Sequence, residues 1–241
     1  MLSWRMSRPP AAHLVEFLRT TPVFGALPAR EIQSLAASAL EEDRRAREYV
    51  FMEGDPAAWL CIVRSGHVRI VRHSRTGKDV VLELLGPGEV FGGVAVIERR
   101  PYPASAQATE ASVVVKLPAE VVAPLVDRHP SVIREMALTM GRRLRAAHDA
   151  VKALAVEPVE ARLAATLLRL ARREGVKGRR GLELPFHLTR QSLADMSGTT
   201  VETTIRVVSR WLREDLVEDA DDRLILRDVD ELRRRAEGEA T

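Results

Sequence analysis

The middle of the chain consists of short apolar or alternating runs separated by turns that contain glycine. Between Glu48 and Leu117 the runs cover residues 49–51, 59–63, 67–71, 80–84 and 112–115. The turns between them contain Glu53-Gly54-Asp55, Ser65-Gly66, Thr76-Gly77-Lys78 and Gly86-Pro87-Gly88. Glycine suits tight turns because it accepts a positive φ, and aspartate suits them because its side chain bonds to nearby backbone. Several short strands at this spacing predict an antiparallel sandwich or barrel.

Helical spacing is found on both sides of this stretch. Leu14–Leu18 and Ala29–Leu40 predict two helices before it, and Pro28 stands at a helix start, where proline is tolerated. Towards the carboxyl terminus, Ala161–Arg173 predicts a helix that ends at Gly175. Beyond that helix we expect a short strand at residues 182–184 and a hairpin strand at residues 223–226.

A longer helix with a different period is predicted after the strands. Its apolar residues recur at alternating steps of four and three, and they are Ile133, Ala137, Met140, Leu144, Ala147, Val151 and Leu154. Such a heptad seam favours a helix that pairs with a copy of itself. The alternative is a helix that packs on its own β-domain. Pro158 ends the helix because proline lacks the amide hydrogen that would continue it.

The stretch from Thr189 to Val217 predicts two short helices joined by a tight turn. Thr189 caps the first helix, Gly198 makes the break and Thr200 caps the second. The apolar face of the first helix is Leu193, Ala194 and Met196. The inward side of the second helix is Thr204 or Ile205, with Val208, Trp211 and Leu212. Two helices joined in this way form a helix-turn-helix, whose second helix can enter the DNA major groove.

The exposed positions of the second helix carry side chains that can recognise base edges. They are Val201, Glu202, Ile205 and Arg206, with Arg210 and Arg213 further along. A glutamate can accept from the amino group of cytosine, and an arginine can bind guanine at two atoms. The alternative interpretation is a helical hairpin in some other kind of domain, but the hairpin strand that follows favours a winged helix-turn-helix.

With these motifs the chain resembles the CRP/FNR family of transcription regulators over residues 14–235. The resemblance rests on the turns Glu53-Gly54-Asp55 and Ser65-Gly66, on Gly86–Gly92, and on Thr189-Arg190-Gln191 and Val201-Glu202-Thr203. It implies an α+β fold with a cyclic-nucleotide-binding-like β-roll at 14–126, a dimerisation helix at 127–156 and a winged helix-turn-helix at 157–236. It also implies a homodimer on a palindromic operator.

The resemblance assigns roles to individual residues. Glu202 and Arg206, with Val201 and Ile205 beside them, are expected to face base edges. The residues expected to hold phosphates are Thr189, Arg190, Gln191, Thr200, Thr203 and Arg210. Val201 stands where the cyclic-AMP-responsive branch has arginine, and Ile205 stands where the FNR branch has serine. An isoleucine can touch a thymine methyl group but donates no hydrogen bond, so we expect an FNR-like half-site only in its core.

The sensor half departs from the cyclic-nucleotide-binding members of the family. In those members an acidic residue after a Phe-Gly pair holds the ribose, and an Arg-Ser pair about ten residues later holds the phosphate. Here Gly93 replaces the acid and Tyr102-Pro103 replaces the Arg-Ser pair. We therefore expect either an effector other than cyclic AMP or no effector at all. The residues expected to line the effector pocket are Phe91, Gly92, Gly93, Val94, Ala104, Ser105 and Met140.

Metal chemistry is limited by the single cysteine, Cys61. One thiol excludes an intramolecular disulfide and is too few for an iron–sulfur cluster held by cysteines alone. Haem remains an alternative cofactor, and its candidate ligands are His13, His67, His73, His129, His148, His187 and Cys61. For each histidine the simpler expectation is a surface or hydrogen-bonded residue, and for Cys61 a buried small hydrophobe. No metal site is predicted.

Composition narrows the function further. The chain has 241 residues, of which 46% are apolar and 29% charged, and a formal net charge of +3. No apolar run approaches the roughly 18 residues of a membrane span, and no phosphate-binding loop or nucleophile motif appears. We expect a cytoplasmic regulator and not an enzyme, with DNA, a second copy and RNA polymerase as partners and no membrane. The family resemblance favours an activator rather than a repressor. The alternatives are a haem-based gas sensor of the same fold and a small-molecule-binding module that acts through protein contacts.

Overall fold

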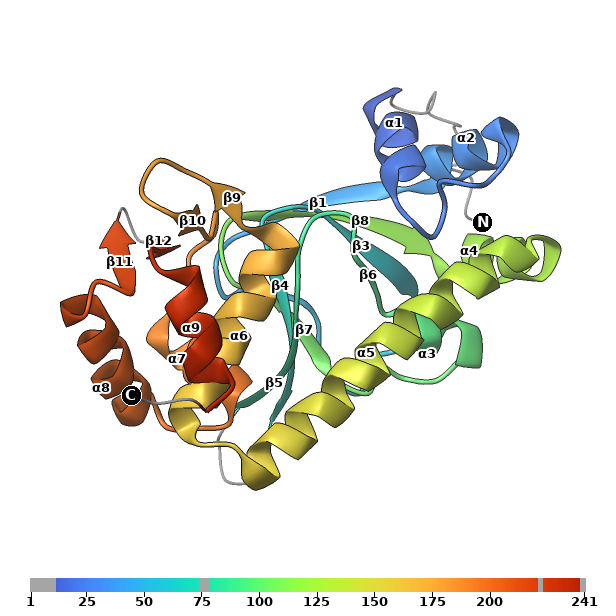
Figure 1. Ribbon diagram of the computed structural model, residues 1–241. Helices are drawn as coiled ribbons and strands as arrows, with labels where there is room; N and C mark the ends of the chain where they lie inside the picture. Colours follow the sequence, from blue (N-terminus) through green and yellow to red (C-terminus); the bar gives the residue numbers. More distant parts are fainter. Residues whose placement is uncertain (1–11, 74–78, 221–222, 239–241) are drawn as a thin grey trace. The chain divides into compact units, whose positions relative to one another are not determined.

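The computed structural model describes residues 12–73, 79–220 and 223–238, except for the side chains of residues 73, 79, 150 and 153–156. These residues form two compact units. One extends to Ile70 and also contains Leu84–Arg142, and the other contains Val71–Glu83 and the chain from Arg143 onward. Figure 1 shows helices and strands in both units. The predicted α+β fold is confirmed.

Two four-stranded antiparallel sheets form the predicted β-roll. The first has the order β1-β8-β3-β6, and its strands are Leu40–Arg44, Ser112–Pro118, Trp59–Ser65 and Val90–Phe91. The second has the order β2-β7-β4-β5, and its strands are Tyr49–Phe51, Ser105–Ala108, Val68–His73 and Asp79–Leu85. All five predicted strands are present. The sequence pattern missed β1, β6 and β7, which are short or carry few apolar residues.

Glycine is required at one of the predicted turns, between β3 and β4. Gly66 has a φ of +72°, and a Cβ atom there would lie 2.4 Å from the Ser112 Oγ and 2.6 Å from the Ala111 carbonyl oxygen. The left-handed backbone and the close approach to β8 each exclude a larger side chain. The glycine therefore allows the turn between β3 and β4 to lie against the start of β8.

Four helices pack on this roll, and they are α1 Ala12–Thr20, α2 Ala29–Ser38, α3 Gly93–Glu98 and α4 Ala119–Arg128. The predicted second helix ends two residues early, because Leu40 already pairs with Lys116 as the first residue of β1. Leu18 and Ile32 are fully buried with Leu60 and Leu117 of the first sheet. The helical spacing of the apolar residues thus becomes the contact between the helices and the strands.

The long helix α5 runs from Pro130 to Val156 (Figure 1). Val132 and Met136 are buried in the core of the first unit, whereas the seam residues Ile133, Leu144 and Val151 are 42%, 58% and 66% exposed. Val132 and Met136, which are not seam residues, therefore attach this helix to its own β-domain. The side chain of Leu154 lies outside the described residues.

The carboxyl-terminal elements form the predicted winged helix-turn-helix. Their helices are α6 Val159–Glu174, α7 Arg190–Ser197, α8 Val201–Arg213 and α9 Val229–Ala236. A four-stranded sheet of order β11-β12-β10-β9 accompanies them, with strands Val217–Ala220, Arg223–Leu226, Leu182–Glu183 and Val176–Lys177. Helix α9 packs along α6 (Figure 1). The sequence pattern missed α9 because Leu232 is its only buried residue.

Candidate nucleic-acid interface

Two threonine caps and a left-handed glycine form the helix-turn-helix. The hydroxyl of Thr189 accepts from the Ser192 amide at 2.9 Å and begins α7. The hydroxyl of Thr200 accepts from the Thr203 amide at 3.3 Å and begins α8. Gly198, with a φ of +60°, ends α7 and turns the chain between the helices. Both predicted caps and the predicted break are confirmed.

The buried side of α8 differs in detail from the expectation. Thr204, Val207, Val208 and Trp211 are buried, and Leu212 is half-buried. The first inward position is therefore Thr204, since Ile205 is 48% exposed. Thr204 can be buried because its hydroxyl donates to the Thr200 carbonyl oxygen at 3.1 Å. In α7 the expected Met196 is half-buried and Ser197 is buried instead.

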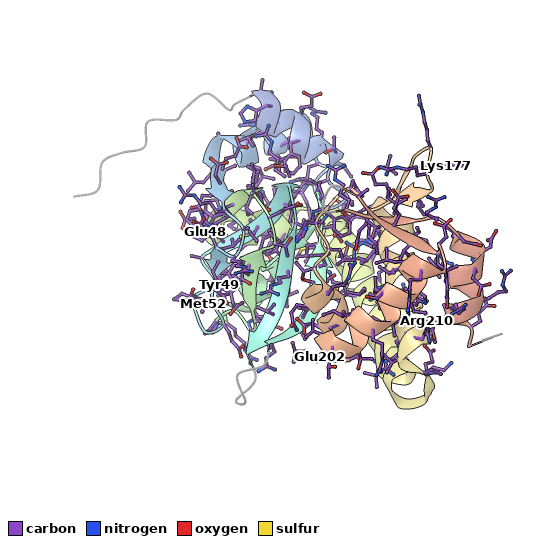
Figure 2. The ribbon with its side chains drawn as sticks, turned by 90° about the vertical axis from the view of Figure 1, so that its left-hand side faces the viewer. Glu48, Tyr49, Met52, Lys177, Glu202 and Arg210 are labelled. Carbon is purple, nitrogen blue, oxygen red and sulfur yellow. The ribbon has the colours of Figure 1, made fainter. Side chains whose placement is uncertain are left out.

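The side chains expected to meet base edges lie on one face of α8. Glu202, Ile205 and Arg206 are exposed, and Val201 is half-buried. Figure 2 shows Glu202 near the start of the helix and Arg210 further along it. Residues three and four apart share a helix face, so a carboxylate, an apolar group and a guanidinium are presented together.

The residues expected to hold phosphates are engaged with neighbouring groups. The Arg190 Nη2 lies 2.5 Å from the Asp219 Oδ2 on β11, and the Gln191 side chain donates to Asp195 at 2.7 Å. The hydroxyls of Thr200 and Thr203 are 3.2 Å apart. The sequence pattern did not indicate Asp219 as a partner, because 29 residues separate it from Arg190.

Helix α6 supports both helices of the motif through residues that the sequence analysis missed. The Arg162 guanidinium donates to the carbonyl oxygens of Ser197 at 3.0 Å, Gly198 at 3.1 Å and Glu157 at 2.7 Å. The Ser197 hydroxyl also donates to the Thr166 hydroxyl at 3.1 Å. Arg162 therefore fixes the turn between α7 and α8.

A second contact joins α6 to the far end of α8. The Glu160 carboxylate forms an ion pair with Arg210 and accepts from the indole nitrogen of Trp211 at 2.9 Å. Burial raises the pKa of this carboxyl, but hydrogen bonds from Trp211, Arg235 and Arg210 outweigh burial and leave the pKa below its ordinary value of 4.5. Glu160 is therefore charged at neutral pH.

Aromatic side chains pack beside Phe91 and Gly92 of the region expected to bind an effector. The Tyr102 ring stacks on Phe51 with centroids 3.6 Å apart, and Phe91 packs against Phe51 at 5.8 Å. The Tyr102 hydroxyl donates to the Trp59 carbonyl oxygen at 2.6 Å and accepts from the Trp59 amide at 3.1 Å. A Cβ atom on Gly92 would lie 3.0 Å from the Tyr102 ring. Burial raises the pKa of Tyr102 to about 12, so its hydroxyl stays protonated.

The other residues of the expected pocket are only partly brought together. Phe91, Gly93, Ala104 and Ser105 are buried, whereas Val94 is 42% exposed and Met140 is half-buried. A Cβ atom on Gly93 would lie 3.0 Å from the Met136 methyl group, so Met136 is a methionine beside Gly93 that the sequence analysis did not name. A separate hollow of about 490 Å³ shares no residue with this set, and it is lined by Phe17, Thr20, Pro22, Arg64, Pro87, Gly88 and Glu89.

The candidate haem ligands are distributed over the described residues. His13 pairs with Glu41, and the Nδ1 of the buried His67 lies 2.6 Å from Glu110. His129 lies 3.4 Å from Glu31, and His148 and His187 are exposed. The side chain of His73 lies outside the described residues.

Cys61 is fully buried, as expected, and burial raises the pKa of its thiol to about 12. Among the described residues there is no group of three or more His, Cys, Asp or Glu side chains that could hold a metal ion. In the same part of the chain, no helix is both long and apolar enough to span a membrane.

Known proteins share both halves of this arrangement. A family model described as a cyclic nucleotide-binding domain matches residues 41–129, and one described as a Crp-like helix-turn-helix domain matches residues 161–235. The cyclic AMP receptor protein of Thermus thermophilus is 32% identical over 201 residues, which are 83% of this chain and 89% of that protein. A CRP-like cAMP-activated global transcriptional regulator of Mycobacterium tuberculosis is 25% identical over 221 residues, which are 92% of this chain and 99% of that protein.

Solved structures agree in fold. FixK2 of Bradyrhizobium japonicum superposes with a TM-score of 0.72 at 24% identity, covering 81% of this chain and 96% of that one. The fold and the interface define a DNA-binding transcription regulator with a nucleotide-binding-like sensor domain. The chain belongs to the CRP/FNR family. Its relatives are transcription regulators rather than enzymes.

Proposed function

We propose that this regulator binds a palindromic operator as a homodimer and activates transcription through contact with RNA polymerase. The observation that carries the proposal is the exposed face of α8, where Glu202, Ile205 and Arg206 lie together. A Pseudomonas aeruginosa relative that is 26% identical is a transcriptional activator protein, which supports activation. We also propose a cytoplasmic location, because the protein has to reach chromosomal DNA in order to bind an operator.

Base recognition is divided between two charged side chains. Arg206 binds a guanine through its O6 and N7 atoms, and Glu202 accepts from a cytosine amino group. Ile205 adds an apolar contact with a thymine methyl group, and Val201 flanks it. Thr189, Gln191, Thr200 and Thr203 hold phosphates beside the amino-terminal ends of α7 and α8, where the helix dipoles attract anions. Arg190 joins them by exchanging Asp219 for a phosphate.

Dimer formation is assigned to the seam of α5. Its residues Ile133, Leu144 and Val151 are 42–66% exposed in the single chain, and they recur at heptad spacing. A stripe of this kind is stabilised when a second copy covers it. The two-fold symmetry then places two α8 helices in successive major grooves about 34 Å apart, so each half-site is read once.

We propose that the sensor domain does not bind cyclic AMP. The support is Tyr102, whose ring fills the space beside Gly92 and whose hydroxyl is bonded to Trp59. A buried cyclic phosphate needs a cation, and the Arg-Ser pair that supplies it in other members is replaced by Tyr102-Pro103. Calorimetric titration with cyclic AMP should give no binding heat, and saturable binding would contradict this point. A Soret band in the purified protein would identify haem instead.

Selection from a random pool of duplexes tests the DNA-binding proposal. The purified protein should enrich one near-palindrome with half-sites about 10 base pairs apart, and its affinity should fall steeply with added salt. Enrichment of no motif, or binding to protein partners alone, would favour the small-molecule-binding module.

The dimer is tested by Leu144→Glu. A charge at this exposed seam position should give a monomer in sedimentation experiments and at least about a hundred-fold loss of operator affinity, since each half-site then binds alone. Arg145→Glu, on the same helix but off the seam, is the matched control and should remain a dimer. A dimeric Leu144→Glu protein would place the interface elsewhere.

A further inference from the structure

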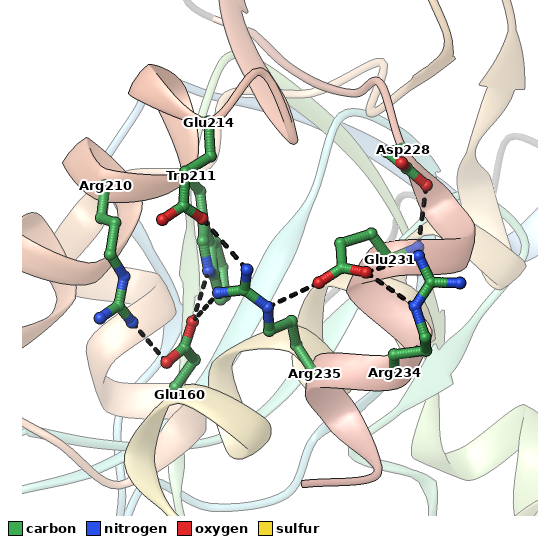
Figure 3. Close-up of polar contacts among 8 residues, drawn as sticks. All are labelled: Glu160, Arg210, Trp211, Glu214, Asp228, Glu231, Arg234 and Arg235. Atoms are coloured by element: carbon green, nitrogen blue, oxygen red, sulfur yellow. Dashed lines mark hydrogen bonds and ion pairs between the residues drawn. The ribbon is translucent and has the colours of Figure 1, made fainter. Parts of the chain in front are cut away.

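Glu160 is the centre of a partly buried polar cluster that joins three helices of the carboxyl-terminal unit (Figure 3). It stands in the first turn of α6, two residues after Pro158, and its side chain is 22% exposed. Its Oε2 pairs with Arg210, and its Oε1 accepts from Trp211 and from the Arg235 Nη1, each at 2.9 Å. One carboxylate therefore contacts α8 twice and α9 once.

The carboxylate is held in its orientation by a second layer of ion pairs. The Arg235 Nε donates to Glu231 at 2.8 Å, and its Nη2 lies 3.3 Å from Glu214 (Figure 3). Arg235 is 17% exposed and Glu231 is 15% exposed, so water screens these contacts only weakly. The position of the Glu160 oxygens is thus fixed from the side of α9.

The two α8 partners of Glu160 are consecutive residues with opposite surroundings. Trp211 is fully buried, and Arg210 has a side chain that is 43% exposed. Arg210 is four residues beyond Arg206, so it lies along the flank of the exposed face. Its guanidinium is therefore close to the surface that meets DNA while it is bound to a carboxylate.

Resting on the proposed DNA-binding function, we propose that Glu160 is a positioning residue for operator recognition. It fixes the carboxyl-terminal half of α8 through Trp211, and it keeps the Arg210 guanidinium from DNA phosphates. The phosphate role that the family resemblance gives to Arg210 is then absent while Glu160 is charged. Glu202 and Arg206, both in the amino-terminal half of α8, then provide the charges that meet base edges.

A phosphate gains little by replacing the carboxylate that Arg210 already binds. Both partners are anions that form charge-assisted hydrogen bonds with a guanidinium, and the exchange would leave the partly buried Oε2 of Glu160 without the donor that Arg210 provides. Only cations that neutralise a phosphate release counterions, so a withheld Arg210 does not contribute to the salt dependence of binding. The salt slope therefore reports whether Arg210 is withheld.

The experiment measures the affinity of the full chain for a 30-base-pair random-sequence duplex against salt concentration. Arg210→Ala should leave the slope of log K against log[salt] unchanged. Glu160→Gln keeps an acceptor for Trp211 but removes the charge, so Arg210 is released and the slope should steepen by about 0.9 per bound protomer. The double variant should return to the wild-type slope. Asp230→Asn removes one negative charge from α9 outside the cluster, where Asp230 pairs with Arg233, and is the matched control, with no change in slope.

Trp211→Phe tests the positioning role separately. It keeps a large ring but removes the indole hydrogen-bond donor, so the preference for the selected operator over the random duplex should fall several-fold with the salt slope unchanged. Loss of stability alone would weaken binding to both duplexes together.

The outcomes distinguish a failure of the role proposed for Glu160 from a failure of the proposed DNA-binding function. If Arg210→Ala makes the slope of log K against log[salt] shallower than in the wild type by about 0.9 per protomer, Arg210 contacts a phosphate and Glu160 does not withhold it. An unchanged slope in folded Glu160→Gln overturns the same point. An unchanged operator preference in Trp211→Phe overturns the positioning role. If the wild-type protein binds neither duplex, the proposed function itself is wrong.

Discussion

The sensor pocket region and the α8 face use their side chains in opposite ways. Around Gly92, Tyr102 is 3% exposed and stacked on Phe51, so the space is filled by the chain itself. On α8, Ile205 is 48% exposed and Glu202 and Arg206 point to solvent. Filled space stabilises the folded state, whereas exposed polar groups on a rigid helix are available for a ligand. The difference predicts that substitutions in the first region change stability and those in the second change recognition.

The largest expected effect is the loss of the Tyr102 ring. Tyr102→Ala should lower the free energy of unfolding by about 3–5 kcal/mol, because it leaves a cavity and removes the partner of the Trp59 backbone. Tyr102→Phe, which keeps the ring, is the control and should cost about 1–3 kcal/mol. Urea denaturation measures both. A Tyr102→Ala protein as stable as the wild type would mean that the ring does not support the roll.

A recognition residue should give the opposite result. Arg206→Ala should cost about 1–3 kcal/mol of operator affinity at one base position and relax the specificity there. Its unfolding free energy should stay within about 0.5 kcal/mol of the wild type, since the side chain is exposed. Binding assays on a set of operators with single base changes measure the first quantity. An equal loss on every sequence would show that Arg206 binds phosphate.

Acid should act on the carboxyl-terminal unit through the Glu160 cluster. Glu160 and Glu231 of this cluster each have a pKa below 4.5 in the folded protein, as does Glu218 on β11, which pairs with Arg180 and Arg227. A lowered pKa contributes stability that is present above about pH 4.5 and is lost as the pH falls through the folded value, because the unfolded chain binds more protons there. The urea concentration at the unfolding midpoint, measured between pH 7 and pH 3, should therefore decrease once the pH is below about 4.5. Glu160→Gln should reduce this dependence, and an unaltered pH profile would contradict the assignment.

The smallest expected effect concerns Arg190. Asp219→Asn removes its partner, and the pair is exposed enough that its net strength is about 0.2–1 kcal/mol. Duplex affinity should rise by about two- to five-fold, because Arg190 no longer exchanges a carboxylate for a phosphate. Asp215→Asn, whose side chain pairs with Arg227 instead of Arg190, is the charge-matched control. Weaker binding by Asp219→Asn would indicate that Asp219 holds Arg190 ready for DNA.

Local signals predicted most of the fold. Apolar or alternating runs predicted the strands, and glycine-containing segments predicted the turns between them. The caps Thr189 and Thr200 and the break at Gly198 predicted the helix-turn-helix. The exposed face of α8 follows from the same spacing. The pattern failed at β1, where helical spacing continues into Leu40 although that residue pairs with β8. It also failed at α9, whose charged sequence buries one leucine.

The contacts that hold the interface could not be predicted from the sequence. Glu160 and Trp211 are 51 residues apart, and Arg162 and Ser197 are 35 residues apart. No periodicity links such pairs, because they depend on how the helices pack. The filling of the sensor region is similar. The sequence indicates that Tyr102 stands in place of an Arg-Ser pair, but only the structure shows the ring stacked on Phe51.

Arg162 has a consequence for how a signal could reach the operator. Its guanidinium binds the carbonyl of Glu157, just before the proline that starts α6, and also the carbonyls of Ser197 and Gly198. One side chain therefore contacts both the connector after the long helix and the turn between α7 and α8. Within this unit Arg162 thus links the connector before α6 directly to the helix-turn-helix.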